Sequence, residues 1–466
     1  MRNSQARPRL ALALIVAAPL LVSACYVKDQ LLAPQNPGTV DASAVGNANA
    51  ALALRVGAIG RLRNVVDGGD ERLWQEIGNL TDEYHNADFQ PSRADIDRRQ
   101  MTTDNGDFPY ATVTQQRGFV RDGINAMRTY VKDSTALIGE LYMGLGFLEL
   151  SLAENYCNGI PLGKSEAGVI SLGPPLSNVQ VYDSASNHLD TALAVNKETS
   201  VQGTFVRKAS LIVKARILVD QGKFAEAAAL VPESAVETAY QYLFTTSTGT
   251  NGGLEDNGHW QIQVNTARVS VGDSFDIIAG KPNVIKNALP FASAKDPRVP
   301  VKGPTGSAED GVTPMYVQLI WANRDDPIPM VSGIDARLIE AEAKLNAADY
   351  AGMMTILNKL RTTAQRIGIL AVAAMPAIAT TPTTKDAAID LFFREKAFWT
   401  FGRGQRLSDL RRLMRQYKRA EDQVFPTGKY SFGNTETGTY GHDVNFPVRD
   451  DELPNPNFKG CTYRLP

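Results

Sequence analysis

The fold of this chain is decided by residues 392–413, which read FFREKAFWTFGRGQRLSDLRRL. Apolar residues recur in this stretch at helical spacing, and basic residues alternate with them. The turn Gly402-Arg403-Gly404 divides the stretch into two helices. Two short helices joined so tightly form a hairpin that cannot bury both apolar faces by itself, so the rest of the chain must pack around it.

The same stretch resembles the motif R-E-R-x-x-E-(L/F)-x-x-E-G-x-R-x-x-D-L-R-R of the SusD/RagB-like nutrient-uptake lipoproteins of the bacterial outer membrane. The matching residues are Arg394, Glu395, Gly404, Arg406, Asp409, Leu410, Arg411 and Arg412. The sequence departs from the motif at Trp399 and Arg403, where many members carry acidic residues. The ion pairs that those acids make therefore have no counterpart in this pattern.

Further elements of the same family follow in order along the chain. Residues 156–162, YCNGIPL, resemble the Y-G-x-(V/I)-P-(L/Y) element that ends a long buried helix in the family. Residues 446–456, FPVRDDELPNP, resemble its closing P-I-P-x-x-E-x-x-x-N-P, with Arg449 in place of the second proline. A third resemblance, to A-E-A…N-x-x-R, rests on Ala341, Glu342, Ala343, Asn358 and Arg361.

The N-terminus has the pattern of a secretory signal peptide, residues 1–24. Basic residues precede an apolar run over residues 10–22, which is too short for a stable transmembrane span. Cys25 directly follows Val22-Ser23-Ala24, which makes a lipobox and predicts lipidation of Cys25. Acyl chains would anchor the protein stably. The alternative is an ordinary signal with a chance cysteine. Tyr26 is not the aspartate that retains lipoproteins at the inner membrane, which favours the outer membrane.

The cysteine count points to one disulfide. The chain has three cysteines, and lipidation of Cys25 leaves Cys157 and Cys461 in an oxidising compartment. We therefore predict a Cys157–Cys461 bond; the alternative is two buried free thiols. The charge is nearly balanced, with 48 basic and 50 acidic residues, which argues against nucleic acid as a partner.

The body of the chain reads as helical hairpins with irregular insertions. A lipid-anchored tether is expected at residues 25–41 and a SusD-like domain over residues 42–466. The helical hairpins are expected at about residues 108–157, 178–231, 332–366 and 385–418. Residues 205–231 and 334–366 have tetratricopeptide-like spacing, but they are not a multiple of 34 residues apart, so we predict separate hairpins rather than a tandem array.

An irregular insertion is expected at about residues 245–330. It is rich in Gly, Asn, Asp, Pro and Ser, and residues 259–264 and 315–320 read as short strands. Ordered insertions of this length in a compact protein are usually functional. The fold class implied by the resemblance is mainly α: tetratricopeptide-like hairpins packed against an irregular, loop-rich binding half with a few short strands.

The sequence predicts binding rather than catalysis. We find no nucleophile elbow, P-loop, dinucleotide fingerprint or two-histidine zinc motif, and we predict no catalytic residues, no metal and no cofactor. Sugars are bound by aromatic faces beside amides and carboxylates. The ligand-binding candidates are Trp74, Tyr84 with Asn86, Phe89, Trp260 and Trp321. For each of them the alternative is packing in the core.

The resemblance implies a role as well as a fold. It implies a non-enzymatic lipoprotein of the outer membrane, exposed at the cell surface, that captures an oligosaccharide or another nutrient too large for porins. The protein would deliver this ligand to a TonB-dependent β-barrel transporter. Two other hypotheses stay open from the residues: a periplasmic tetratricopeptide-type scaffold that binds proteins, and a surface hydrolase.

Overall fold

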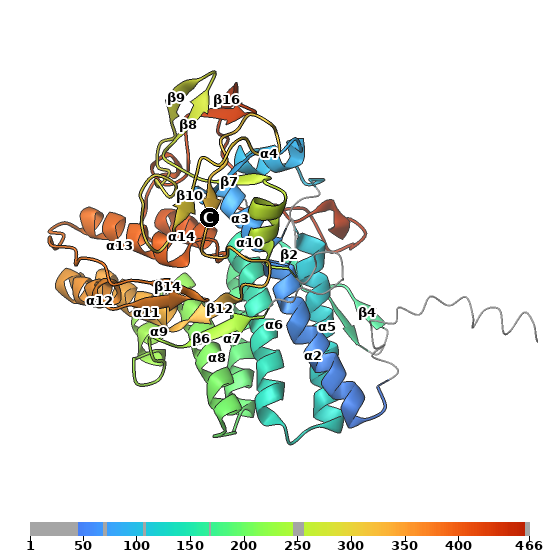
Figure 1. Cartoon of the computed structure of the whole chain (residues 1–466). Coiled ribbons are helices and arrows are strands. Elements are labelled where there is room, and N and C mark those ends of the chain that lie inside the picture. Colours follow the sequence, from blue (N-terminus) through green and yellow to red (C-terminus); the bar gives the residue numbers. More distant parts are fainter. Residues whose placement is uncertain (1–44, 69–71, 106–108, 167–168, 246–255, 462–466) are drawn as a thin grey trace, which may run out of the picture. The chain divides into compact units, whose positions relative to one another are not determined.

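The computed structural model describes residues 45–461, apart from residues 69–71, 106–108, 167–168 and 246–255 (Figure 1). The predicted signal peptide, Cys25 and the predicted tether lie outside the described residues. The helices are α2 (Ala48–Val66), α3 (Leu73–Leu80), α4 (Pro91–Asp97), α5 (Tyr110–Tyr130), α6 (Thr135–Asn155), α7 (Asn178–Val195), α8 (Val201–Asp220), α9 (Phe224–Leu230), α10 (Gly258–Trp260), α11 (Gly333–Asn346), α12 (Tyr350–Thr362), α13 (Lys385–Thr400) and α14 (Arg406–Arg415). A π-helical turn spans Gln261–Asn265, and 3₁₀ turns span Glu421–Gln423 and Asp450–Glu452.

The strands pair two by two, always antiparallel, and in the described residues they build no larger sheet. The pairs are β1 (Tyr84–Asn86) with β7 (Val269–Val271), β2 (Ile160–Pro161) with β5 (Pro175–Leu176), β3 (Lys164–Glu166) with β4 (Val169–Ser171), β6 (Gln241–Phe244) with β12 (Ile328–Ser332), β8 (Phe275–Ile278) with β9 (Lys281–Val284), β10 (Val301–Lys302) with β11 (Val317–Gln318), β13 (Gln365–Ile367) with β14 (Leu370–Val372) and β15 (Lys429–Phe432) with β16 (Thr435–Thr439).

Helix α6 forms the centre of the helical half. It packs against α2, α5, α7 and α8, which surround it in Figure 1. Among the described helices it is the one whose length and apolarity would allow it to span a membrane, but 89% of its most apolar window is buried inside the protein. A helix that is apolar on all sides and covered by four neighbours is a core helix.

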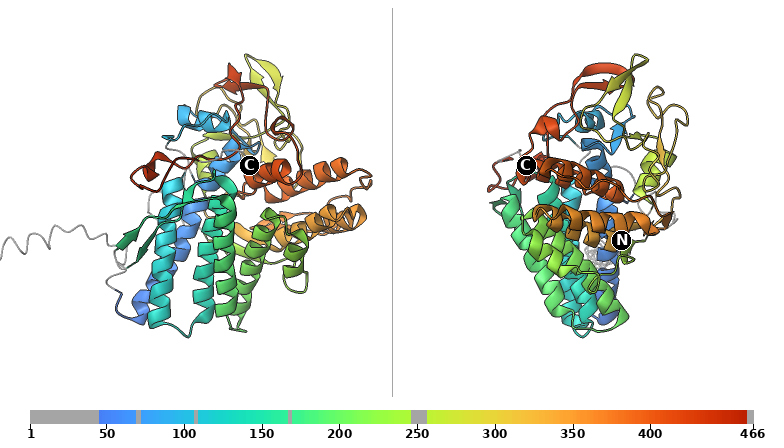
Figure 2. Two further views of the ribbon diagram at one scale, coloured as in Figure 1. Left: turned by 180° about the vertical axis from the view of Figure 1, so that it is seen from behind. Right: turned by 90° about the vertical axis from the view of Figure 1, so that its left-hand side faces the viewer.

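The tetratricopeptide-like hairpins, distant in sequence, lie together in space. Helices α8 and α9 form one hairpin, α11 and α12 form the other, and α9 packs against α11 (Figure 2). The pairing of β6 with β12, with Phe244 opposite Ile328, closes the base of the insertion. The insertion therefore leaves the helical stack uninterrupted, because its two ends meet at this ribbon.

The insertion itself differs in part from expectation. Residues 259–264, expected as a strand, are helical, because α10 continues into the π-helical turn; the Asn257 side chain caps α10 by accepting from the Trp260 amide at 3.0 Å. Residues 315–320 contain the short strand β11, as expected. Before the insertion, α3 ends at Leu80, and the chain then forms β1.

The hairpin α13–α14 is held by buried ion pairs to distant segments. Arg403 Nη2 lies 2.5 Å from Asp335 Oδ2, which stands at the start of α11. Arg406 Nε lies 2.6 Å from Asp82 Oδ1, on the segment before β1. Buried charges are stable only where they are paired in this way, so these cations tie the hairpin to both halves of the fold. Ion pairs also join Arg412 to Glu342, and Glu395 to Arg298 and Arg361, whereas the pair of Lys396 with Asp409 links the two helices of the hairpin to each other.

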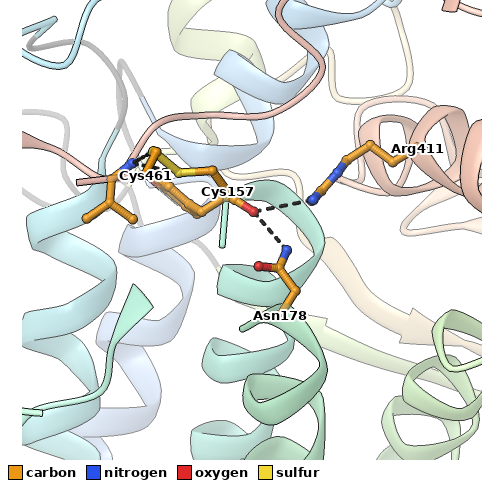
Figure 3. The surroundings of a disulfide bond; sticks show 6 residues. Cys157, Asn178, Arg411 and Cys461 are labelled. Atoms are coloured by element: carbon orange, nitrogen blue, oxygen red, sulfur yellow. Dashed lines mark hydrogen bonds between the residues drawn. A yellow bond between two sulfur atoms is a disulfide. The ribbon is translucent and has the colours of Figure 1, made fainter. Parts of the chain in front are cut away.

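The C-terminal end of α6 is the second junction (Figure 3). The carbonyl oxygens at a helix C-terminus lack partners within the helix. Here Arg411 of α14 and Asn178 of α7 act as these partners, and both donate to the carbonyls of Ala153 and Tyr156. Asn178 Nδ2 lies 2.7 Å from the Ala153 oxygen and 2.9 Å from the Tyr156 oxygen. Here the sulfur atoms of Cys157 and Cys461 are joined in a disulfide, with Cα atoms 5.8 Å apart. The bond ties the C-terminal segment to the end of the core helix.

Candidate ligand-binding cleft

The residues proposed from the sequence as ligand contacts lie mostly in the core. The side chains of Trp74, Tyr84, Asn86 and Trp321 are all buried, each at 2% exposure or less. They offer no aromatic face or free amide to a ligand, so for these four the alternative interpretation, core packing, describes the structure. Trp260 is partly exposed.

Three of these aromatic residues surround the turn Gly402-Arg403-Gly404. A Cβ atom on Gly404 would lie 2.1 Å from Trp74 Cδ1, and one on Gly402 would lie 2.9 Å from Trp321 Cζ3 and 3.1 Å from the Tyr84 hydroxyl. Both glycines also have a positive φ, +67° at Gly402 and +65° at Gly404. The turn fits into an aromatic socket only because it carries no side chains at these two positions.

Polar groups complete the socket. The Tyr84 hydroxyl lies 2.7 Å from His259 Nδ1, and His259 Nε2 lies 3.3 Å from Asp67 Oδ1. Burial lowers the pKa of His259 to about 3 and raises the pKa of Asp67 to about 8. Burial also raises the pKa of Glu83 to about 8, although its carboxyl accepts the Gly402 amide at 2.9 Å. These groups are held uncharged at neutral pH and serve the packing of the turn.

Asn86 likewise has a structural role. Its amide side chain donates to the carbonyl of Asp88 at 3.3 Å, and its backbone N–H donates to Asp97 Oδ2 at 2.8 Å. The first contact holds the turn after β1, and the second fixes the end of β1 against α4. The middle residue of this strand, His85, has the opposite orientation, because side chains alternate between the two faces of a strand.

His85 borders a cleft in the irregular half, the candidate functional site. The cleft is built from three parts of the chain that are far apart in sequence: β1, the insertion and the segment around β15. It encloses about 670 Å³ that is open to solvent. The lining residues are His85, Ser270, Val271, Asp273, Phe275, Asp276, Ile277, Ile285, Thr313, Pro314, Tyr316, Ser431 and Asn434.

The cleft combines aromatic surface with oriented acceptors. Phe275 is 42% exposed, and Tyr316 is half-buried. Asp273 accepts through Oδ1 from the Ser274 amide at 2.7 Å and from the Ser293 hydroxyl at 3.0 Å. Aromatic faces beside fixed carboxylates are the combination that covers the apolar face of a sugar and accepts from its hydroxyls.

The second carboxylate is fixed in the same way. Asp276 accepts from Asn283 Nδ2 at 2.8 Å and from the Ser431 hydroxyl. Ile285, which lines the cleft, packs with Tyr430 and Tyr440 in one apolar cluster. The site is therefore largely preformed, with its polar groups held by neighbours on other segments.

His85 is the cation at this site. Burial by itself would lower its pKa, but the carboxylate of Asp97, 2.9 Å from Nδ1, and the more distant Asp276 and Asp310 raise it to about 9. The imidazole is therefore protonated at neutral pH. Its ring also packs edge-on against Tyr430, with ring centroids 5.9 Å apart.

The candidate cleft lies partly in the insertion that the sequence marks as functional, but residues other than the sequence candidates line it. The composition of the insertion indicates a functional segment. Trp260 and Trp321 are candidates within it because tryptophan is a common sugar contact. Phe275 and Tyr316 have no local pattern that marks them as exposed. Tyr84 and Asn86 were chosen although the residue between them, His85, borders the cleft.

Comparison with known proteins supports the fold. No family model matches the sequence, and no curated protein matches it. Solved structures do match. One is a laminarin-binding SusD-like protein, with TM-score 0.62 and 14% identity, covering 89% of this chain and 99% of that chain. A SusD superfamily protein from Bacteroides thetaiotaomicron matches with TM-score 0.62 and 13% identity, covering 89% of this chain and 100% of that chain.

A SusD-like carbohydrate-binding protein from Bacteroides vulgatus matches with TM-score 0.57 and 15% identity, covering 89% of this chain and 97% of that chain. At these identities the likeness establishes the fold. The chain therefore has the SusD-like fold, mainly helical with tetratricopeptide-like hairpins, and the fold class expected from the sequence is confirmed.

Proposed function

We propose that this protein is a glycan-binding protein that captures an oligosaccharide in the cleft between β1, the insertion and β15. The observation that carries the proposal is the cleft itself, where Phe275 and Tyr316 stand beside the fixed carboxylates of Asp273 and Asp276. The fold is shared with a laminarin-binding protein and with a carbohydrate-binding protein, which supports a glycan as the class of ligand.

The proposal includes a cellular role. The lipobox at Cys25 would anchor the protein to the outer membrane, at the cell surface, and the bound ligand would pass to a TonB-dependent β-barrel transporter. The protein would break no bond of the ligand. Affinity would come from ring stacking and hydrogen bonds in a preformed site.

Binding is tested by calorimetric titration of the mature chain with a panel of oligosaccharides. Tyr316→Ala and Phe275→Ala should each weaken binding by about five- to thirtyfold, since a stacked aromatic ring contributes about 1–2 kcal/mol. Tyr130→Ala is the matched control, because Tyr130, at the end of α5, is 41% exposed but does not line the cleft. Equal affinity of the wild type and both cleft variants would place the ligand elsewhere.

The cellular role has separate tests. Purification from detergent-solubilised outer membranes should bring down a stoichiometric TonB-dependent barrel. Cys25→Ser should release the protein from the membrane fraction. Chromatography of an oligosaccharide after long incubation with the protein should show it intact; shortened products would instead favour the hydrolase hypothesis.

A second candidate function rests on a groove in the helical half. It lies between α11, α12 and residues 233–240 and encloses about 930 Å³. Its wall contains Glu233, Glu237 and Glu340, with Arg337 Nε 2.8 Å from Glu340 Oε2, and the apolar Ile356 and Leu360. A protein-binding scaffold would use this groove. Recovery of periplasmic proteins alone in the purification, with no affinity for glycans, would favour it.

A further inference from the structure

The ligand class follows from the charges and hydrogen bonds of the cleft. This inference rests on the proposed function and asks which glycans the same site accepts. Among the lining residues that the structure describes, Asp273 and Asp276 are carboxylates and His85 is the cation. The charge of His85 is balanced by Asp97, which lies 2.9 Å behind it. The two lining carboxylates therefore have no cation left to neutralise them within the lining.

The serine and threonine hydroxyl protons of the lining are already used inside the protein. Ser270 donates to the carbonyl of Pro314 at 2.9 Å, Thr313 donates to Asp310 at 2.5 Å, and Ser431 donates to Asp276. These three hydroxyls therefore have no proton left for a ligand, although each keeps an acceptor lone pair.

The carboxylates keep free acceptor capacity. All three donor groups that reach Asp273, from Ser274 and Ser293, bind Oδ1, which leaves Oδ2 without a hydrogen bond from the described residues. Each oxygen of Asp276 accepts one hydrogen bond and has capacity for another. A ligand that fills these positions must donate hydrogen bonds, and sugar hydroxyls do so.

An anionic sugar does not match these acceptors, because its charged group accepts hydrogen bonds and does not donate them. A uronate or sulfate group would bring a further acceptor and a negative charge toward Asp273 and Asp276. The apolar cluster around Ile285, which lines the cleft, would reduce the screening of this charge by water. We propose that the cleft selects uncharged, hydroxyl-rich sugar units and excludes uronates and sulfated sugars. Tyr316 and Phe275 would cover the ring face, and Asp273 and Asp276 would accept from its hydroxyls.

The test compares neutral and anionic glycans of equal length. The mature chain is titrated with neutral gluco-, manno-, xylo- and galacto-oligosaccharides, and with oligogalacturonides, at 50 and 500 mM NaCl. We expect a neutral oligosaccharide to bind with little dependence on salt. Oligogalacturonides should bind at least about tenfold more weakly, and the added salt should narrow the difference because it screens the repulsion.

A variant assigns this selectivity to the cleft. Asp273→Asn keeps the size of the side chain but removes its charge, so it should weaken neutral binding about three- to tenfold and reduce the discrimination against galacturonides. The matched control is Asp133→Asn, an exposed carboxylate in the connection between α5 and α6, which should change neither affinity. Thermal unfolding of both variants checks that each one is folded.

The outcomes separate the two proposals. Galacturonide binding that equals or exceeds neutral binding, and that Tyr316→Ala abolishes, would overturn the charge selectivity while leaving glycan binding in the cleft intact. Selectivity that is unchanged in Asp273→Asn would also overturn it. If no glycan of the panel binds, the proposed function itself fails, and the inference fails with it.

Discussion

The socket around Gly404 leads to a sharp prediction about stability. In Gly404→Ala the new methyl group would lie 2.1 Å from Trp74 Cδ1 and 2.4 Å from Nε1. The indole cannot turn away easily, because Trp74 is 2% exposed and packs against Phe244 with ring centroids 6.2 Å apart. The substitution also places alanine at φ +65°.

Two costs add in this variant. Alanine in the left-handed region costs about 1–2 kcal/mol relative to glycine. Overpacking against a buried ring costs about 1–3 kcal/mol more. We therefore expect the free energy of unfolding to fall by about 2–5 kcal/mol.

A matched control isolates the packing cost. Gly222, in the turn between α8 and α9, has φ +78°, but no other atom lies within 4 Å of the position that a Cβ atom would take there. Gly222→Ala should therefore lose only the backbone contribution, about 1–2 kcal/mol. The measurement is urea unfolding of the mature chain and both variants, followed by circular dichroism and tryptophan fluorescence. Equal losses in the two variants would refute the view that the aromatic socket, rather than backbone conformation alone, selects glycine at position 404.

Three further perturbations have expected outcomes. Arg412→Leu leaves Glu342 buried without its cationic partner, which is 2.5 Å away in the wild type, and should lower the free energy of unfolding in urea by about 3–5 kcal/mol. Lys429→Ala breaks the exposed pair Lys429–Glu436 and should lower it by less than about 1 kcal/mol. Cys461→Ser removes the disulfide, which joins residues 304 positions apart, and should lower the free energy of unfolding by up to about 5 kcal/mol under oxidising conditions. A reducing agent should lower the stability of the wild type but not that of the variant. Equal sensitivity of both proteins to the reducing agent would contradict this. Burial raises the pKa of Glu83 in the folded state to about 8. The contribution of this group to stability is therefore full below the unfolded-state pKa and is lost as the pH rises toward 8, so Glu83→Gln should flatten the decline in stability between pH 5 and 8. An unchanged pH profile would count against a buried neutral carboxyl.

Much of the helical half was accessible from sequence. The hairpin of residues 385–418 appears as α13 and α14, divided at the expected glycines, and the hairpin expected at about 108–157 appears as α5 and α6. These elements have strong periodicity or a continuous apolar composition, so their burial is specified locally. The tetratricopeptide-like hairpins are separated in the sequence by the insertion, as expected. In space they lie together, because the β6–β12 ribbon joins the two ends of the insertion.

The candidate site was accessible only in outline. Trp74, Tyr84 and Trp321 have the chemistry of sugar contacts, but the turn at Gly402–Gly404 uses their faces. Arg403, which departs from the family motif, finds its acid in Asp335, 68 positions earlier in the sequence. No local pattern shows which aromatic side chain another segment will cover.

The sequence by itself therefore determined the helical elements, the division of the chain into hairpins and an irregular insertion, and the cysteines available for a bond. The tertiary structure alone decided which residues line the cleft. Local periodicity specifies that a side chain is buried, whereas exposure at a site depends on contacts between segments such as β1, the insertion and β15, which are far apart in the sequence. For this reason His85, Phe275 and Tyr316 line one cleft, while Trp74 and Trp321, which were candidates with core packing as the alternative, lie in the core.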